Sequence, residues 1–181
     1  MNIYKLSGLL APIVAFTSII LAIITHPWFS LTDNAISDLG AINVEYNYIL
    51  NYGLILSGVF GAIFSIGIYK IFKSTISKTG SLLVLIGCIF LILIGLFPEG
   101  SKPHYYVSVL FFAMTTLGIF LVGIGTIGTD REYASTTLFL VVVGFFVSIF
   151  FLNIFPGVAM AELTASMIYS IWMVYTSYVI Y

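Results

Sequence analysis

Four polar side chains, in or beside the connections between apolar segments, belong to types that transfer protons or bind metal ions. They are Asp33, Asp38, His104 and Glu162. A neutral imidazole serves as a general base or a metal ligand, and carboxylates orient such a base or bind a divalent cation. Together they predict a catalytic site with one histidine and several carboxylates. The metal-dependent version of this hypothesis is a divalent cation bound by His104, Glu162 and Asp38.

These residues also have a simpler structural interpretation. His104 and Glu162 each fall in the first turn of a predicted helix, where the helix dipole disfavours an imidazolium and favours a carboxylate. A histidine there can simply bind a loop carbonyl, and a glutamate can simply cap its helix. The chain has no HExxH, GxSxG or P-loop motif that would decide for catalysis. Ser37 and Ser108 fall on the same side, but no motif identifies either as a nucleophile.

The composition indicates which elements must position these residues. Hydrophobic residues make up 61% of the 181 and charged residues 7%, against about 25% charged in an average soluble domain. Six apolar stretches reach the ~20 residues that a helix needs to cross a bilayer. We therefore expect an all-α, polytopic membrane protein, a bundle of six transmembrane helices in one domain over residues 1–181. The predicted spans cover about 6–27, 48–69, 79–97, 104–127, 135–155 and 162–181.

Charge and cysteine content exclude other classes. The net charge is −1, and there is no stripe of Lys and Arg, so we expect no nucleic-acid partner. Cys88 is the only cysteine, which rules out a disulfide or a CxxC metal site within one chain. Membrane lipids are the partners that the composition implies, and no protein partner is predicted.

The basic residues set the orientation of the bundle. Five of the six fall at the N-terminus or in connections on one side of the predicted membrane, and only Lys102 falls on the other. Because short cytoplasmic loops carry the excess of Lys and Arg, both termini are expected in the cytoplasm of an integral protein of the cell membrane. The five are Lys5, Lys70, Lys73, Lys78 and Arg131. The first apolar stretch is too long for a signal peptide and is expected to remain as a helix.

Three hairpins then lie on the outer side, and each has a proline where the chain leaves a span. Proline ends the preceding helix because it lacks an N–H and clashes with the turn before it. Two hairpins also match in detail, since Phe97-Pro98 precedes His104 as Phe155-Pro156 precedes Glu162, each by six residues after the proline. The match predicts that spans five and six are a copy of spans three and four, related by an axis along the membrane normal; the alternative is that there is no internal duplication.

The first outer loop contains a predicted short helix. Ser30 and Asp33 have a spacing similar to a capping box, and Gly40 is a good C-terminal stop. At helical periodicity Asp33, Asn34, Ser37 and Asp38 share one face. We expect a short interfacial helix over residues 30–40. Its polar face turns either toward the outer mouth of the bundle or simply toward water.

The motif Ser37-Asp38-Leu39-Gly40, followed by Phe97-Pro98-Glu99 and His104, resembles the domain-of-unknown-function 998 family of prokaryotic six-helix membrane proteins. The resemblance covers the whole chain and implies the same order of six spans. Similar proteins carry Asp after the Phe-Pro pair and a Glu-Arg pair in the last span. This chain has Glu99 at the first place and Glu162-Leu163 at the second, so it lacks that arginine. The family has no characterised function, and the resemblance therefore implies no activity.

Three hypotheses for function follow. The first is an enzyme or binding protein for a lipid or lipid-linked substrate, with the histidine and carboxylates at the outer mouth. The second is a non-catalytic membrane module in which these polar residues tie the loops to the bundle. The third is a transporter of a small solute or ion, which is disfavoured because no predicted span has a charged residue near its centre.

Overall fold

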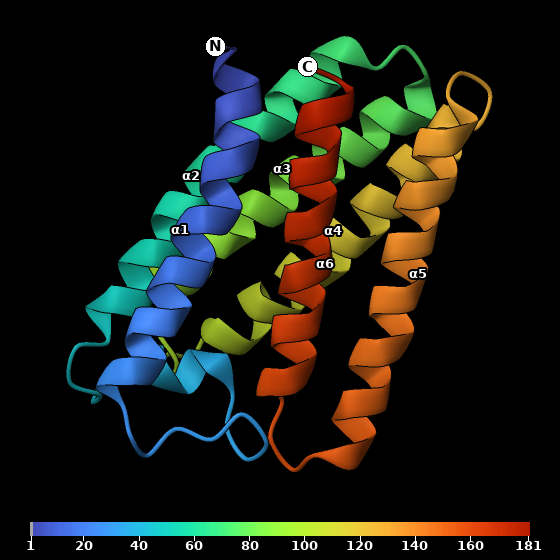
Figure 1. The fold of residues 1–181 in the computed structure, drawn as a ribbon. Coiled ribbons are helices and arrows are strands. Elements are labelled where there is room, and N and C mark those ends of the chain that lie inside the picture. The colour runs from blue at the N-terminus through green and yellow to red at the C-terminus, as the bar shows by residue number, and fades with distance from the viewer. Residues whose placement is uncertain (1) are drawn as a thin grey trace.

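The computed structural model describes residues 2–181, which form six long α-helices and one short 3₁₀ helix. Both termini lie at one end of the helix bundle (Figure 1), and we call the opposite end the distal end. It is formed by residues 26–47, 97–103 and 155–158. The elements are α1 (Ile3–Thr25), η1 (Ile36–Gly40), α2 (Tyr48–Ile71), α3 (Thr75–Leu96), α4 (His104–Thr126), α5 (Arg131–Ile154) and α6 (Ala159–Val179).

Each long helix packs against the next one in the chain, and α6 returns to α1, so the six helices close a ring. By length and composition, α1 to α5 are able to cross a membrane. An all-helical chain with several membrane-type helices is thus confirmed. The helix α6 has 21 residues but is not among the five helices that are apolar enough to cross a membrane. That α6 crosses the membrane therefore stays a prediction.

Hydrogen-bonded caps explain why two helices begin earlier than hydropathy predicts. The side chain of Asn2 accepts a hydrogen bond of 3.0 Å from the N–H of Tyr4, which starts α1 at Ile3. Asp130 likewise accepts one of 3.0 Å from the N–H of Tyr133, which starts α5 at Arg131 rather than 135. A cap satisfies one of the free N–H groups of a first turn, and hydropathy does not register this.

The first distal connection, residues 26–47, contains a shorter helix than predicted. Residues 31–34 form turns, and only Ile36–Gly40 is helical, with 3₁₀ geometry. The Asp38 carboxylate accepts hydrogen bonds from the Ala35 N–H at 2.9 Å and from the Asn34 amide at 3.2 Å. Local bonds of Asp and Asn to nearby backbone compete with a regular helix, so the polar face predicted over residues 30–40 does not form as one helical face.

Close packing of α3 on α4 contrasts with looser packing of α5. A Cβ placed on Gly80 would lie 2.5 Å from the Gly118 carbonyl oxygen, so these two backbones are in direct contact. The helices α4 and α5 lie close together at the end of the bundle that carries the chain termini, where a Cβ on Gly123 would lie 2.8 Å from Leu138. Toward the distal end they diverge (Figure 1), which leaves room for a cavity.

Candidate functional site

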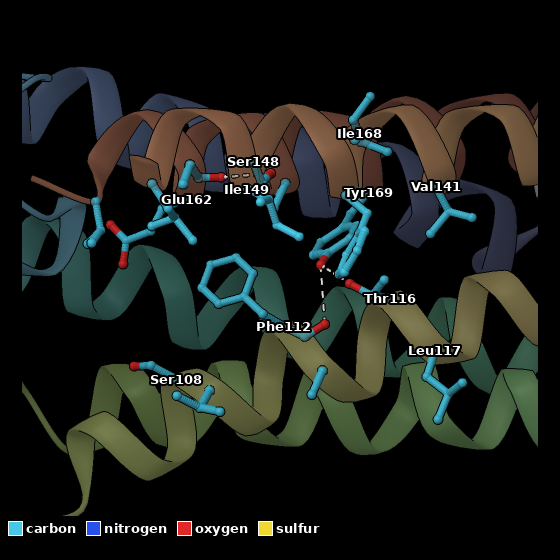
Figure 2. A pocket seen from close by; sticks show the side chains of 18 of the residues that line it. Ser108, Phe112, Thr116, Leu117, Val141, Ser148, Ile149, Glu162, Ile168 and Tyr169 are labelled. Carbon is cyan, nitrogen blue, oxygen red and sulfur yellow. Dashed lines mark hydrogen bonds between the residues drawn. The ribbon is translucent and has the colours of Figure 1, made fainter. Parts of the chain in front are cut away.

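A cavity of about 1050 Å³ lies between α4, α5 and α6, and we call it the α4–α5–α6 cavity (Figure 2). Its walls are formed by side chains of α4 from His104 to Phe120, of α5 from Val141 to Leu152, and of the segment from Val158 to Tyr169. Ala35 and Ser37 of the first distal connection cover its distal end. A volume of this size matches the upper end of sites for small molecules and cofactors, about 300–1,000 Å³.

The cavity opens sideways between α4 and α5. Val109 and Leu117 of α4 and Phe145 and Phe146 of α5 all line it, and all four side chains are exposed on the surface of the bundle. These two helices are also apolar enough to cross a membrane. In a bilayer the opening would therefore face lipid chains rather than water.

Polarity divides the cavity along its length. Its polar lining gathers at the distal end, in Ser37, Glu99, His104, Ser108 and Glu162. Figure 2 shows Ser108 and Glu162 toward one end of the pocket, with Leu117 and Val141 toward the other. The cavity thus combines a polar end with an apolar interior, the arrangement that an amphiphile requires.

The polar atoms deeper in the cavity are already hydrogen-bonded. The Tyr169 hydroxyl donates to the Phe112 carbonyl oxygen at 3.2 Å and accepts from the Thr116 hydroxyl (Figure 2). Ser148 donates to the Ala161 carbonyl oxygen at 3.2 Å. Because these groups have partners, the interior presents mainly hydrocarbon to a ligand.

His104 lies at the first turn of α4, buried, with both ring nitrogens engaged. Its Nδ1 lies 2.8 Å from the Phe97 carbonyl oxygen. Its Nε2 lies 3.1 Å from a carboxylate oxygen of Glu99 and 3.3 Å from the hydroxyl oxygen of Ser108. The predicted bond to a loop carbonyl is therefore present, and the second nitrogen faces groups that line the cavity.

Glu162 lies in the first turn of α6 and ties that helix to the first distal connection. Its carboxyl accepts a hydrogen bond of 2.6 Å from the N–H of Ile36, the first residue of η1. Two backbone bonds run beside it, from the Gly157 N–H to Thr32 at 2.8 Å and from the Ala159 N–H to Asn34 at 2.9 Å. The side chain thus lines the cavity and also holds its distal cover in place.

The structure does not bring Asp33 and Asp38 into the cavity lining. Asp33 is exposed, and hydrogen bonds from the hydroxyls of Ser30 and Thr32 hold the pKa of its carboxyl below the usual range. Asp38 caps η1 through the Ala35 N–H. Both carboxylates therefore shape the first distal connection.

The predicted metal ligands do not form a cluster in the described residues, and metal binding stays a prediction. Within residues 2–181, no group of three or more His, Cys, Asp or Glu side chains could hold a metal ion. His104, Glu162 and Asp38 do not come together as ligands, because Asp38 bonds within its own loop and Glu162 bonds the Ile36 N–H.

His26 is the other buried histidine, and it fastens the start of the first distal connection. Its Nδ1 lies 2.6 Å from the Ala22 carbonyl oxygen and its Nε2 lies 2.7 Å from that of Glu45. The Thr25 hydroxyl oxygen also lies 3.1 Å from Nδ1. This histidine is occupied by backbone and lies outside the cavity lining.

Ser108 is the contact that sequence analysis did not select. It follows His104 by four residues on α4, and residues at that spacing share one helix face. The spacing of His104 and Ser108 was therefore visible in the sequence. It did not indicate a site, because the sequence does not show that this helix face lines a cavity. Glu99, which follows the Phe-Pro pair, is the other partner of His104 that the structure adds.

Comparison with known proteins supplies a family but no activity. No curated protein and no solved structure gave a significant match to the chain. A family model described as "Protein of unknown function (DUF998)" matches residues 9–178, nearly the whole chain. The chain therefore belongs to the DUF998 family, the family that its Ser-Asp-Leu-Gly and Phe-Pro-Glu motifs resemble.

Proposed function

We propose that this protein binds a lipid or lipid-linked molecule and acts on it at the outer leaflet. The apolar chain would occupy the α4–α5–α6 cavity, and the headgroup would meet the polar distal end. The observation that carries the proposal is the shape of that cavity, which is apolar inside, polar at one end and open sideways between two membrane-type helices. Such an opening admits an amphiphile directly from the bilayer.

The dimensions of the cavity support this occupant. Its wall on α4 extends from His104 to Phe120, and sixteen helical residues rise about 24 Å. The hydrocarbon core of a bilayer is about 30 Å thick. With its headgroup at the distal end, a lipid chain could therefore lie along a cavity wall that is longer than the hydrocarbon thickness of one leaflet.

The orientation of the bundle is part of the proposal. Lys5, Lys70, Lys73, Lys78 and Arg131 belong to the end of the bundle that carries the termini. The positive-inside rule favours that end in the cytoplasm and the distal end outside. With both termini on one side, α6 is the sixth crossing of the cell membrane of a prokaryote.

A non-catalytic membrane module is the alternative, and one observation favours it. The carboxyl groups of Asp33, Asp38 and Glu162 all accept hydrogen bonds from the first distal connection itself. In that case the polar residues hold loops together, and the cavity is filled by bulk lipid without selectivity. A transporter is less well supported, because no charged residue lines the cavity beyond its distal end within residues 2–181.

Lipid retention tests the proposal. Leu117→Trp places a large ring in the cavity wall, and Leu56→Trp is the matched control, since both leucines are 46% exposed and Leu56 on α2 lies outside the cavity lining. Each protein would be purified in mild detergent and its bound lipid measured by native mass spectrometry. We expect the parent and Leu56→Trp to retain one defined lipid class. The amount of that lipid bound to Leu117→Trp should be at least tenfold lower.

Two outcomes contradict the proposal. Equal retention of lipid by all three proteins would place the bound lipid elsewhere. Retention of a mixture that mirrors the whole membrane would favour the non-catalytic module, because a specific site enriches one class over the others.

A further inference from the structure

The orientation of the His104 ring is fixed by the end of α3. That helix ends at Leu96, and the carbonyls of a last turn lack partners within the helix. Pro98 follows and has no N–H to offer. The Phe97 carbonyl instead accepts from Nδ1 of His104 at 2.8 Å. A carbonyl cannot donate, so Nδ1 carries the hydrogen and Nε2 of the neutral ring is left as an acceptor.

Nε2 faces a hydroxyl that can supply its proton. The Ser108 oxygen lies 3.3 Å from Nε2, one helical turn further along α4. Glu99 places a carboxylate oxygen 3.1 Å from the same nitrogen. A carboxylate cannot donate to a neutral ring, but it stabilises the imidazolium that forms when the ring takes the serine proton. A serine hydroxyl, a correctly oriented base and a charge partner therefore meet at one point of the cavity wall.

We propose that Ser108 is a nucleophile for long-chain acyl esters, with His104 as its general base. The inference deepens the proposed function and rests on it. Ser108 Oγ forms a bond to the ester carbonyl carbon while its proton passes to His104 Nε2. The carbon–oxygen bond to the alcohol breaks, and the departing oxygen takes that proton. Water then attacks the acyl-serine, gives one proton through Nε2 back to Oγ, and releases the fatty acid.

The position of Ser108 along the cavity selects this substrate class. The apolar wall of α4 beyond it extends to Phe120, twelve residues and about 18 Å away. One leaflet of hydrocarbon is half of about 30 Å. An acyl chain inserted to that depth brings its carbonyl carbon beside Ser108, and the alcohol part of the ester then lies among the polar residues of the distal end.

The test uses alkyl fluorophosphonates, which transfer phosphorus to an activated serine with loss of fluoride. The purified full-length protein would be treated with a long-chain and an ethyl probe, and the adduct located by intact-mass and peptide mass spectrometry. We expect one adduct, on Ser108. Ser108→Ala should give none, while Ser135→Ala should label like the parent, because Ser135 is exposed and donates to Arg131 within its own helix.

The role of the base has its own measurement. His104→Ala should slow labelling at least about 100-fold, the usual contribution of a general base. Glu99→Gln keeps the ring bond to Phe97 and should slow labelling less, since it removes only the charge that stabilises the imidazolium. Melting temperatures of each variant separate slow labelling from unfolding.

The outcomes distinguish this inference from the proposed function. An unlabelled parent, or an adduct that persists in Ser108→Ala, overturns the serine mechanism even where Leu117→Trp loses its lipid. If Leu117→Trp reacts with the long-chain probe as fast as the parent does, the proposed chain site is wrong. If it loses the long-chain probe but keeps the ethyl probe, both are supported.

Discussion

Removal of the Glu162 carboxyl should loosen the first distal connection. The carboxyl oxygen lies 2.6 Å from the N–H of Ile36, whose side chain is buried. In Glu162→Ala that N–H, whose hydrogen bond is partly buried, loses its acceptor, and an unsatisfied donor shielded from water costs about 1–3 kcal/mol. For a chain of this length, each kcal/mol lowers the melting temperature by about 2–4 °C. We therefore expect a melting temperature about 2–12 °C below the parent.

Glu162→Gln provides the first comparison. The amide keeps a carbonyl oxygen that can accept from the Ile36 N–H, so its cost should stay below about 1 kcal/mol. Glu99→Ala is the second, since Glu99 is 41% exposed and its pair with His104 is worth about 0–1 kcal/mol. The expected order of melting temperatures places Glu162→Ala clearly lowest of the three.

Amide hydrogen exchange localises the effect. In Glu162→Ala, exchange of the Ile36 amide should accelerate about 5- to 30-fold for a loss of 1–2 kcal/mol. Exchange in the middle of α3 should stay at the parent rate, because the lost bond joins η1 to α6 and does not involve the backbone of α3. A melting temperature of Glu162→Ala equal to that of Glu99→Ala, with unchanged exchange at Ile36, would refute the reasoning.

Three further predictions concern the scaffold. Gly157→Ala places a Cβ about 2.4 Å from backbone of the first distal connection and should cost about 1–3 kcal/mol in thermal melts, whereas Gly128→Ala, with no atom within 4 Å, should melt like the parent. Ser57→Ala removes the 2.9 Å bond from α2 to the Ala11 carbonyl of α1, which should cost about 0.6 kcal/mol on the same measurement. The pKa of Asp33 is lowered in the folded state, so its contribution to stability exists above the unfolded value and is lost as pH falls through the folded one. The parent should therefore lose more stability than Asp33→Asn below pH ~4, and equal acid losses would contradict that interpretation.

The helices were predictable because their signal is long and one-sided. A run of about 20 apolar residues has few other stable states in a chain so poor in charge, and five of the six predicted spans correspond to helices of membrane type. Helix ends were less predictable, because they depend on single hydrogen bonds. The caps at Asn2 and Asp130 move α1 and α5 by three and four residues from the predicted ends.

The candidate site was predictable only in part. His104 and Glu162 were selected from matching positions in two proline-led hairpins, and both line the cavity. Asp33 and Asp38 were predicted on one helical face of the first loop, turned toward His104 and Glu162. That face does not form, because hydroxyl and backbone donors within the same loop bind both carboxylates. The cavity itself depends on how far α4 and α5 diverge, and no local pattern in either helix encodes that angle.

The two polar residues of the cavity that sequence analysis selected have different tasks. Glu162 has a carboxyl oxygen bound to the N–H of Ile36, so it is a positioning residue for the distal cover, and a reaction that needed this carboxyl free would first open the cover. His104 is anchored through Nδ1, the nitrogen that faces away from Ser108, and this anchor leaves Nε2 directed at the Ser108 hydroxyl. In the proposed reaction the reactive groups therefore lie at the start of α4, where Ser108, and Glu99 from the preceding connection, meet that nitrogen. The α6 side of the cavity would then contribute to the shape that holds the chain.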